Sequence, residues 1–83
     1  MDKNEILNSD WCVRRNAAEN PNTPADVLTE LAKDSDIVVR RRVACNPNTP
    51  VDVLTELAKD SDWCVRCFVA RNPKLKEVLT DKK

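Results

Sequence analysis

Asn46-Pro47-Asn48-Thr49-Pro50 decides the fold, together with the ten residues Val51–Asp60 that follow it. The same five residues occur 26 positions earlier, where Asn20-Pro21-Asn22-Thr23-Pro24 precedes residues 25–34. A fixed period of this size is typical of repeat architectures, in which each unit is a small supersecondary structure that packs on its neighbours. We therefore analyse the chain in units of this length.

Two complete units and one partial unit follow one another. The windows Ser9–Asp34 and Ser35–Asp60 are identical at 20 of 26 positions, and a third copy begins at Ser61 and departs from the pattern after Asn72-Pro73. We expect a single repeat domain over residues 1–83, with units at about 9–34, 35–60 and 61–83. Residues 1–8 are expected to be the stub of a preceding helix, because terminal repeats are atypical.

The first helix expected in each unit follows the Thr-Pro pair. Its apolar residues fall on one face of a helix over residues 24–33, with a copy over 50–59. Thr23 and Asp26 are expected to cap its N-terminus. The apolar face is formed by Val27, Leu28, Leu31 and Ala32.

The second helix is expected over residues 37–45, with equivalents near 11–19 and 63–71. Ser35 and Asp36 precede it as capping residues, and it must end at Asn46 because the residue before a proline is pushed out of the helical region. Its buried stripe is predicted to contain Val39, Val43 and Ala44, with Val13, Ala17, Ala18, Val65, Val69 and Ala70 as their equivalents.

No segment alternates as a β-strand would, so the sequence predicts an all-α fold, a short α-solenoid of about three helix–turn–helix units. The pattern Asn-Pro-x-Thr-Pro-x-x-Val-Leu-x-x-Leu-Ala-x-Asp-x-Asp-x-x-Val-Arg resembles the leucine-rich repeat variant (LRV) unit, and Asp36, Arg40 and Ala44 resemble a HEAT-repeat helix. The resemblance covers about residues 9–80. It implies a right-handed superhelix of stacked helix pairs and no defined activity. Members of the family that bind an iron–sulfur cluster are thought to do so through an added cysteine-rich segment, which is not found here.

The composition excludes several classes of function. Fourteen basic residues balance fourteen acidic ones, which argues against binding a polyanion by bulk charge. Glycine and histidine are absent, so glycine-rich phosphate loops, histidine bases and histidine metal ligands are excluded. The charged N-terminus does not resemble a signal peptide, and no apolar run could span a membrane. We expect a cytoplasmic protein without cofactor.

One arginine recurs in all three units, four residues after an aspartate. The spacing places acid and base on the same helix face in the favourable order. We expect a structural ladder of Asp–Arg pairs that links successive units, with direct ligand contact as the alternative. The ladder residues are Asp10, Arg14, Asp36, Arg40, Asp62 and Arg66.

The remaining arginines give each unit a charge dipole. Residues 35–46 have a net charge of +2 and residues 49–60 a net charge of −2. Five of the six differences between the first two units lie in the 11–19 and 37–45 helices, which favours these helices as a recognition surface on a constant scaffold. Drift at positions that face water predicts the same pattern. The expected binding residues are Arg15, Asn16, Glu19, Arg41, Arg42, Cys45, Phe68 and Arg71.

Aromatic residues occupy two informative positions. Phe68 replaces the polar Asn16 and Arg42 of the other units, and is expected either to cap the last repeat against Leu75, Val78 or Leu79 or to be an exposed anchor. Trp11 and Trp63, which replace Ile37, are expected to be packing residues.

Four cysteines without a secretory signal are expected to be free thiols. Trp63-Cys64-Val65-Arg66-Cys67 resembles the Trp-Cys-x-x-Cys of thioredoxin-like proteins, but the strand and βαβ context that this motif requires are not predicted. Cys64 and Cys67 supply two ligands where a metal site requires three or four, so no metal is expected. A thiol-based site at this pair is the weakest of the hypotheses considered.

No nucleophile–base pair can be assembled, so we expect no enzymatic activity. The sequence favours a non-catalytic scaffold that binds a protein, not identified by the sequence, through the 11–19, 37–45 and 63–71 helices. Nucleic-acid binding by an arginine stripe on the same surface is the alternative. Either a monomer or an end-to-end oligomer is compatible with the sequence.

Overall fold

The computed structural model describes residues 2–74, and this part of the chain contains six helices and no strand. In chain order they are α1 (Lys3–Leu7), α2 (Trp11–Glu19), α3 (Ala25–Leu31), α4 (Ile37–Cys45), α5 (Val51–Leu57) and α6 (Trp63–Arg71). The all-helical prediction is confirmed.

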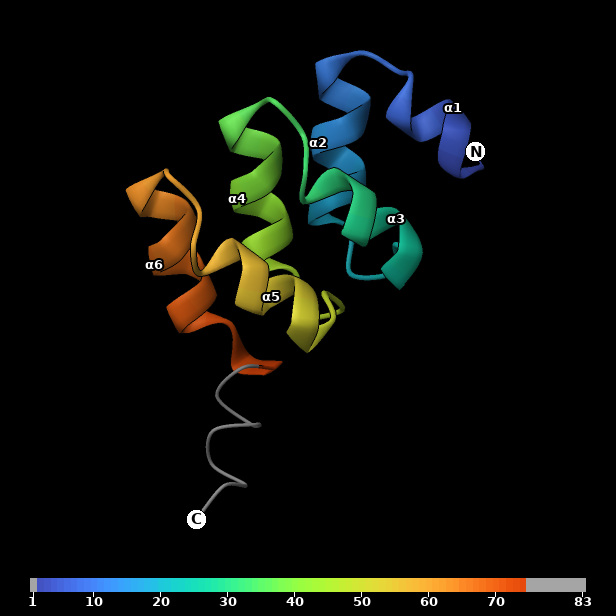
Figure 1. The fold of residues 1–83 in the computed structure, drawn as a ribbon. Coiled ribbons are helices and arrows are strands. Elements are labelled where there is room, and N and C mark those ends of the chain that lie inside the picture. Colours follow the sequence, from blue (N-terminus) through green and yellow to red (C-terminus); the bar gives the residue numbers. More distant parts are fainter. Residues whose placement is uncertain (1, 75–83) are drawn as a thin grey trace.

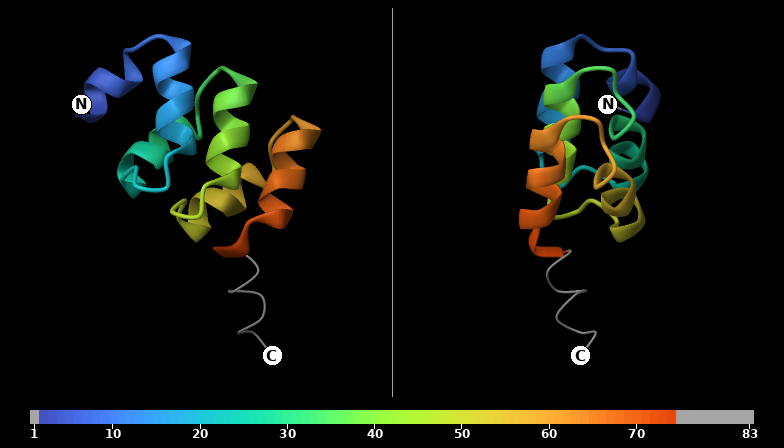
Figure 2. Two further views of the ribbon diagram at one scale, coloured as in Figure 1. Left: turned by 180° about the vertical axis from the view of Figure 1, so that it is seen from behind. Right: turned by 60° about the vertical axis from the view of Figure 1, so that its left-hand side comes forward.

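The helices form two layers (Figures 1 and 2). One layer contains α2, α4 and α6 side by side, and the other contains α1, α3 and α5. The chain alternates between the layers, so each unit adds one helix to each layer. This arrangement is that of a short helical solenoid, as the repeat predicted.

Aspartates begin each helix of the first layer. The carboxylate of Asp10 accepts a hydrogen bond from the Val13 amide, and Asp36 accepts from Val38 and Val39. Asp62 caps α6 in the same way. The expected capping role is therefore confirmed for Asp36, while the other N-terminal residue, Ser35, is exposed and does not cap the helix.

Helices α3 and α5 are shorter than expected, with seven residues each. The prediction that Thr23 caps α3 is wrong, because Pro24 is the N-cap residue and has no capping side chain. Asp26 does bond to a first-turn amide, since its carboxylate accepts a hydrogen bond from Val27 N at 2.9 Å. The Thr23 hydroxyl turns back and donates to the Ala17 carbonyl at 2.6 Å, and Thr49 donates to Val43 in the same way at 2.7 Å. These threonines therefore close the end of the preceding helix.

The core lies between the layers and follows the predicted stripes. Leucines and valines of α3, α4, α5 and α6 form one cluster of buried side chains. Removing such side chains from water is the main favourable contribution to the stability of a small domain. The fully buried members include Leu28, Leu31, Val39, Val43, Leu54 and Val65.

Two predicted packing positions differ from expectation. Ala70 is exposed, and Trp63 exposes 67% of its surface, so its assignment as a packing residue is wrong. Trp11, at the same repeat position, does pack against the core cluster. Position 11 lies beside a following helix of the same layer, whereas α6 is the last helix of that layer in residues 2–74.

Candidate functional site

The expected binding residues all lie on α2, α4 or α6, and we call the exposed side of this layer the B surface. Five of them are exposed, and Arg15, Arg41 and Phe68 are half-buried. The exposed five are Asn16, Glu19, Arg42, Cys45 and Arg71.

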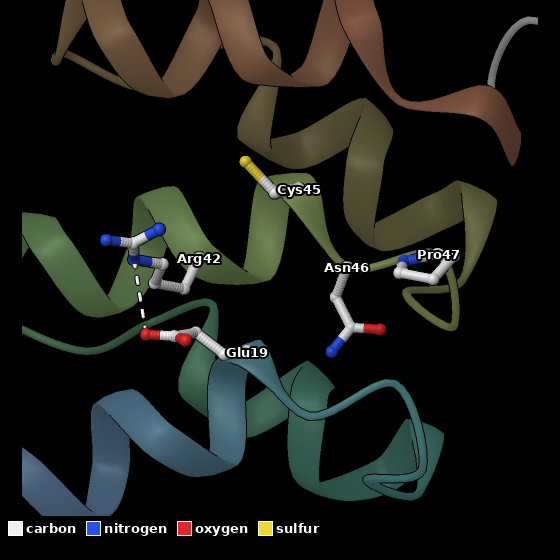
Figure 3. Close-up of a pocket in the computed structure, with 5 residues that line it drawn as sticks. All are labelled: Glu19, Arg42, Cys45, Asn46 and Pro47. Carbon is white, nitrogen blue, oxygen red and sulfur yellow. Dashed lines mark ion pairs between the residues drawn. The ribbon is translucent and has the colours of Figure 1, made fainter.

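Glu19 pairs with two arginines, one in its own helix and one in α4, and Figure 3 shows the pair with Arg42. Its carboxylate Oε1 lies 3.6 Å from Arg15 Nε in α2 and 3.6 Å from Arg42 Nε in α4. The Arg15 guanidinium also lies over the Trp11 ring, 4.8 Å from its centroid. Both ion pairs are longer than a hydrogen bond and the side chains are partly exposed, so they hold the residues loosely.

Arg41 forms a closer pair across the next seam of the layer. Its Nε and Nη2 atoms donate to the two carboxylate oxygens of Asp62 at 3.4 and 3.3 Å. The hydrogen bond from Arg41 lowers the pKa of Asp62, burial opposes this, and the Val65 amide lowers the pKa further. The same hydrogen bond raises the pKa of Arg41. Asp62 is thus both the cap of α6 and the partner of an arginine in α4.

Two hollows lie on either side of Arg42 on the B surface. The first, of about 220 Å³, is lined by Glu19, Arg42, Cys45, Asn46 and Pro47, which Figure 3 shows in place. The second, of about 170 Å³, lies between α4 and α6 and is lined by Val38, Arg41, Arg42 and Phe68. Arg42, with about half of its side chain exposed, separates the two hollows.

Phe68 packs against the core cluster and also lines the second hollow, so it is a partly covered aromatic wall. The contacts expected with Leu75, Val78 and Leu79 lie outside the described residues. Asn16 accepts only a long hydrogen bond of 3.4 Å from Arg15, and Arg71 lies at the C-terminal end of α6. Neither residue lines either of these two hollows.

The arginine ladder exists, but its acidic partners are different from those predicted. Arg14 Nε donates to Asp34 at 2.7 Å, and Arg40 Nε donates to Asp60 at 2.8 Å. The expected partners Asp10 and Asp36 are occupied as N-caps of the arginines' own helices. An aspartate that folds back onto the first amides of its helix is turned away from the residue one turn further along.

The observed partners still connect neighbouring units. Asp34 accepts the amide of Asp36 at 2.9 Å, so the pair with Arg14 ties α2 to the start of α4. Asp60 accepts the Asp62 amide at 2.8 Å and links Arg40 in α4 to the start of α6. Arg66, the third predicted member, is exposed and donates to the carbonyl of Asp60 at 2.6 Å.

A second ladder, made by asparagines, was missed in the sequence. Asn46 Nδ2 donates to the carbonyls of Ala18 and Asn20 at 2.8 and 2.9 Å, and its side chain points from the end of α4 toward the end of α2 in Figure 3. Asn72 repeats this with Ala44 and Asn46 at 2.8 and 3.0 Å. The recurrence of asparagine at positions 20, 46 and 72 is the sequence signal for this ladder. From the sequence alone, it predicts only where a helix ends.

The four cysteines are unpaired thiols. Burial raises the pKa of Cys45, and Arg42 opposes this, so the thiol is held in its neutral form. A neutral thiol is a poor nucleophile and a poor metal ligand. Within residues 2–74 no group of three or more cysteine or carboxylate side chains could hold a metal ion, and none of the helices there is long and apolar enough to cross a membrane.

Comparison with known proteins identifies the repeat. Residues 11–36 match the family model described as Leucine rich repeat variant. This match confirms the family that the sequence pattern indicated, on a segment that runs from the start of α2 to the N-cap of α4. No curated protein and no solved structure gave a match.

Proposed function

Because the chain carries a leucine rich repeat variant unit at residues 11–36 and repeats it along its length, we propose that it is a non-catalytic scaffold that binds a protein through the B surface. Families of this kind are repeat scaffolds, generally for protein interaction. We propose one domain over residues 1–83 with units near 9–34, 35–60 and 61–83. Its free thiols suit a reducing compartment such as the cytoplasm.

The distribution of differences between units supports the B surface. The two layers are built from the same repeat, yet α3 and α5 differ at one position, while α2 and α4 differ at five. Two of the five, Asn16/Arg42 and Glu19/Cys45, place different chemistry at neighbouring exposed points. A constant scaffold with varied exposed residues is the arrangement by which repeat proteins recognise extended partners.

The single observation that carries the proposal is the position of Arg42 between two hollows. A partner that inserts side chains into both would cover a guanidinium whose present ion pair, at 3.6 Å from Glu19, is loose. Arginine and aromatic residues such as Phe68 are enriched among residues that dominate binding energy. The partner we propose presents an acidic group to Arg42 and an apolar group to Phe68.

Nucleic acid remains the alternative partner of this surface. The ion pairs favour a protein, because a phosphate backbone that follows the layer would have to displace Asp62 from Arg41 as well as Glu19 from Arg42, whereas the proposed acidic group displaces only Glu19. Binding that depends on phosphate neutralisation would weaken steeply with salt.

A site-specific cross-linking experiment tests the proposal. A photo-reactive phenylalanine derivative placed at position 45 on the B surface should capture a protein from extract of the source cell, and nuclease treatment should leave this capture unchanged. Position 4, which is exposed on α1 in the other layer and lines neither hollow, is the matched control. Adding Arg42→Glu should abolish capture from position 45. Equal capture from both positions, or capture lost with nuclease, would contradict the proposal.

A further inference from the structure

The layer opposite the B surface contains a groove with its own chemistry. It lies between α3 and α5 and has a volume of about 280 Å³. Its apolar lining includes Val53 and Leu57, which are almost fully buried, and Ala32, which is partly exposed. The small side chain of Ala32 leaves the apolar lining open to solvent.

The rim of the groove is acidic. Asp52 and Glu56 lie four residues apart on α5, so they are neighbours on its surface and repel each other. Neither forms an ion pair with any residue in 2–74, and the third carboxylate, Asp60, is already bonded to Arg40. Helices α3 and α5 together contain four acidic residues and no basic one. Lys33 is the one basic residue in the lining.

The N-terminal unit shows what can pack at this place. Ile6 and Leu7, the last two residues of α1, lie one period of 26 residues before Ala32 and Lys33 and hold the same repeat positions. These larger side chains are partly buried against the core cluster, and α1 contacts α3. At the seam between α1 and α3, two aliphatic side chains of the α1 wall therefore fill the space that Ala32 and Lys33 leave open between α3 and α5.

We propose that the groove between α3 and α5 binds a helical segment of another protein that carries a lysine or arginine followed three or four residues later by isoleucine or leucine. The aliphatic side chain packs on Ala32, Val53 and Leu57, and the basic one lies between Asp52 and Glu56, where it relieves their repulsion. A spacing of three or four residues places the basic and the aliphatic side chain on the same face of the bound helix. This site is separate from the B surface and opposite to it in charge.

The probe is a capped alanine- and glutamine-rich peptide with one Lys-x-x-Ile-Leu motif, titrated into the full chain and followed by methyl NMR. Saturable shifts are expected at Val53 and Leu57. Ala32→Leu should weaken binding at least about tenfold by filling the groove. Ala58→Leu, at the same repeat position but exposed and outside the groove, should leave the affinity unchanged. If Ala32→Leu does not fold, Lys33→Leu, which copies Leu7, replaces it.

Charge variants test the second half of the motif. Glu56→Lys should weaken binding about tenfold, while Glu30→Lys, its equivalent on α3, should not. Arg42→Glu should leave this titration unchanged, so the groove and the B surface fail or succeed independently. Shifts that do not saturate, shifts on α2 and α4 instead, equal effects of the two alanine variants, or a peptide with glutamate in place of lysine that binds as well would each overturn the proposal.

Discussion

The side-chain amide of Asn46 donates a 2.8 Å hydrogen bond to the carbonyl of Ala18, which joins the end of α4 to the end of α2. The last carbonyls of a helix have no partner within the helix, and they are commonly satisfied by a glycine-based turn. The chain has no glycine. Asn46 and Asn72 each donate to carbonyls at the end of the helix in the preceding unit. The same hydrogen bonds therefore close that helix and hold the two units together.

Replacing Asn46 with alanine should lower the free energy of unfolding by about 2–3 kcal/mol. Its two hydrogen bonds to carbonyls of the preceding unit are lost, which leaves those carbonyls without partners, and so is the bond that it accepts from the Asn48 amide. Asn20→Ala is the matched control. Asn20 holds the same repeat position but is exposed, and a change below about 0.5 kcal/mol is expected. Urea denaturation followed by circular dichroism measures both. Equal effects of the two substitutions would show that the hydrogen bonds to α2 do not stabilise the fold.

The Arg40–Asp60 pair predicts a second stability effect. Its side chains are 15% and 11% exposed, and Arg40 also donates to the Asp34 carbonyl at 2.9 Å. Arg40→Ala should cost about 2 kcal/mol, below the cost of breaking a fully buried pair. Arg42→Ala, whose side chain is 49% exposed, should cost less than about 0.5 kcal/mol. If Arg40→Ala and Arg42→Ala lower the free energy of unfolding by the same amount, the Arg40–Asp60 pair does not stabilise the fold as proposed.

Thr49 and Thr55 provide a matched pair of threonines. The Thr49 hydroxyl is fully buried and bonds to Val43 across the turn, while the exposed Thr55 hydroxyl bonds within α5. Thr49→Val should cost about 1 kcal/mol, since a buried hydrogen bond is replaced by a methyl group of similar volume. Thr55→Val should be nearly neutral in the same urea experiment. A neutral Thr49→Val would mean that the hydroxyl contributes little to closing α4.

Asp62 predicts a pH dependence. Its pKa in the folded protein is lowered from 3.8, first by the hydrogen bond from Arg41. A carboxylate with a lowered folded pKa contributes stability that is complete above its unfolded pKa and is lost as the pH falls through the folded value. The protein should therefore lose stability as the pH falls below about 4.

Asp62→Asn should make the urea midpoint depend less on pH in this acidic range. Glu56→Gln, which removes an exposed carboxylate, should retain the dependence of the original protein. If Asp62→Asn and the original protein lose stability in parallel below pH 4, Asp62 does not carry this effect.

The sequence was sufficient for the helices and the core because both depend on local spacing. Val39, Val43 and Ala44 are buried as their helical period predicted, and α4 ends at Cys45, as the Asn46-Pro47 step required. The match to residues 11–36 rests on the same local pattern. Local periodicity determines which face of a helix is apolar, and in a repeat the next helix is always available to cover it.

The side-chain partners could not be predicted because they are set by the path of the turns. Arg14 lies four residues from Asp10 and twenty from Asp34, yet the turn after α3 brings Asp34 to it. The acceptors of Asn46 lie 26 and 28 residues earlier in the chain. The exposure of Trp63 likewise depends on which helix lies beside α6, and not on the residue itself.

The sequence predicted which face of the molecule carries the candidate surface, but not the contacts between its residues. Arg15, Glu19, Arg41 and Arg42 all lie on the layer expected from the charge pattern. The Arg41–Asp62 and Arg42–Glu19 ion pairs cross between helices, and they depend on how neighbouring units are rotated. Phe68 forms the wall of a hollow beside two arginines, and this hollow could not be read from the sequence. The predicted contacts of Phe68 with Leu75, Val78 or Leu79 lie outside the described residues.

The most direct test of the central claim is photo-cross-linking from position 45, compared with position 4 on α1, in extract treated with nuclease. The account predicts one protein captured from position 45 only, with capture lost in Arg42→Glu and kept in Lys59→Glu. Capture that is equal from the two positions, or that disappears with nuclease, would contradict the claim that this repeat scaffold binds a protein through α2, α4 and α6.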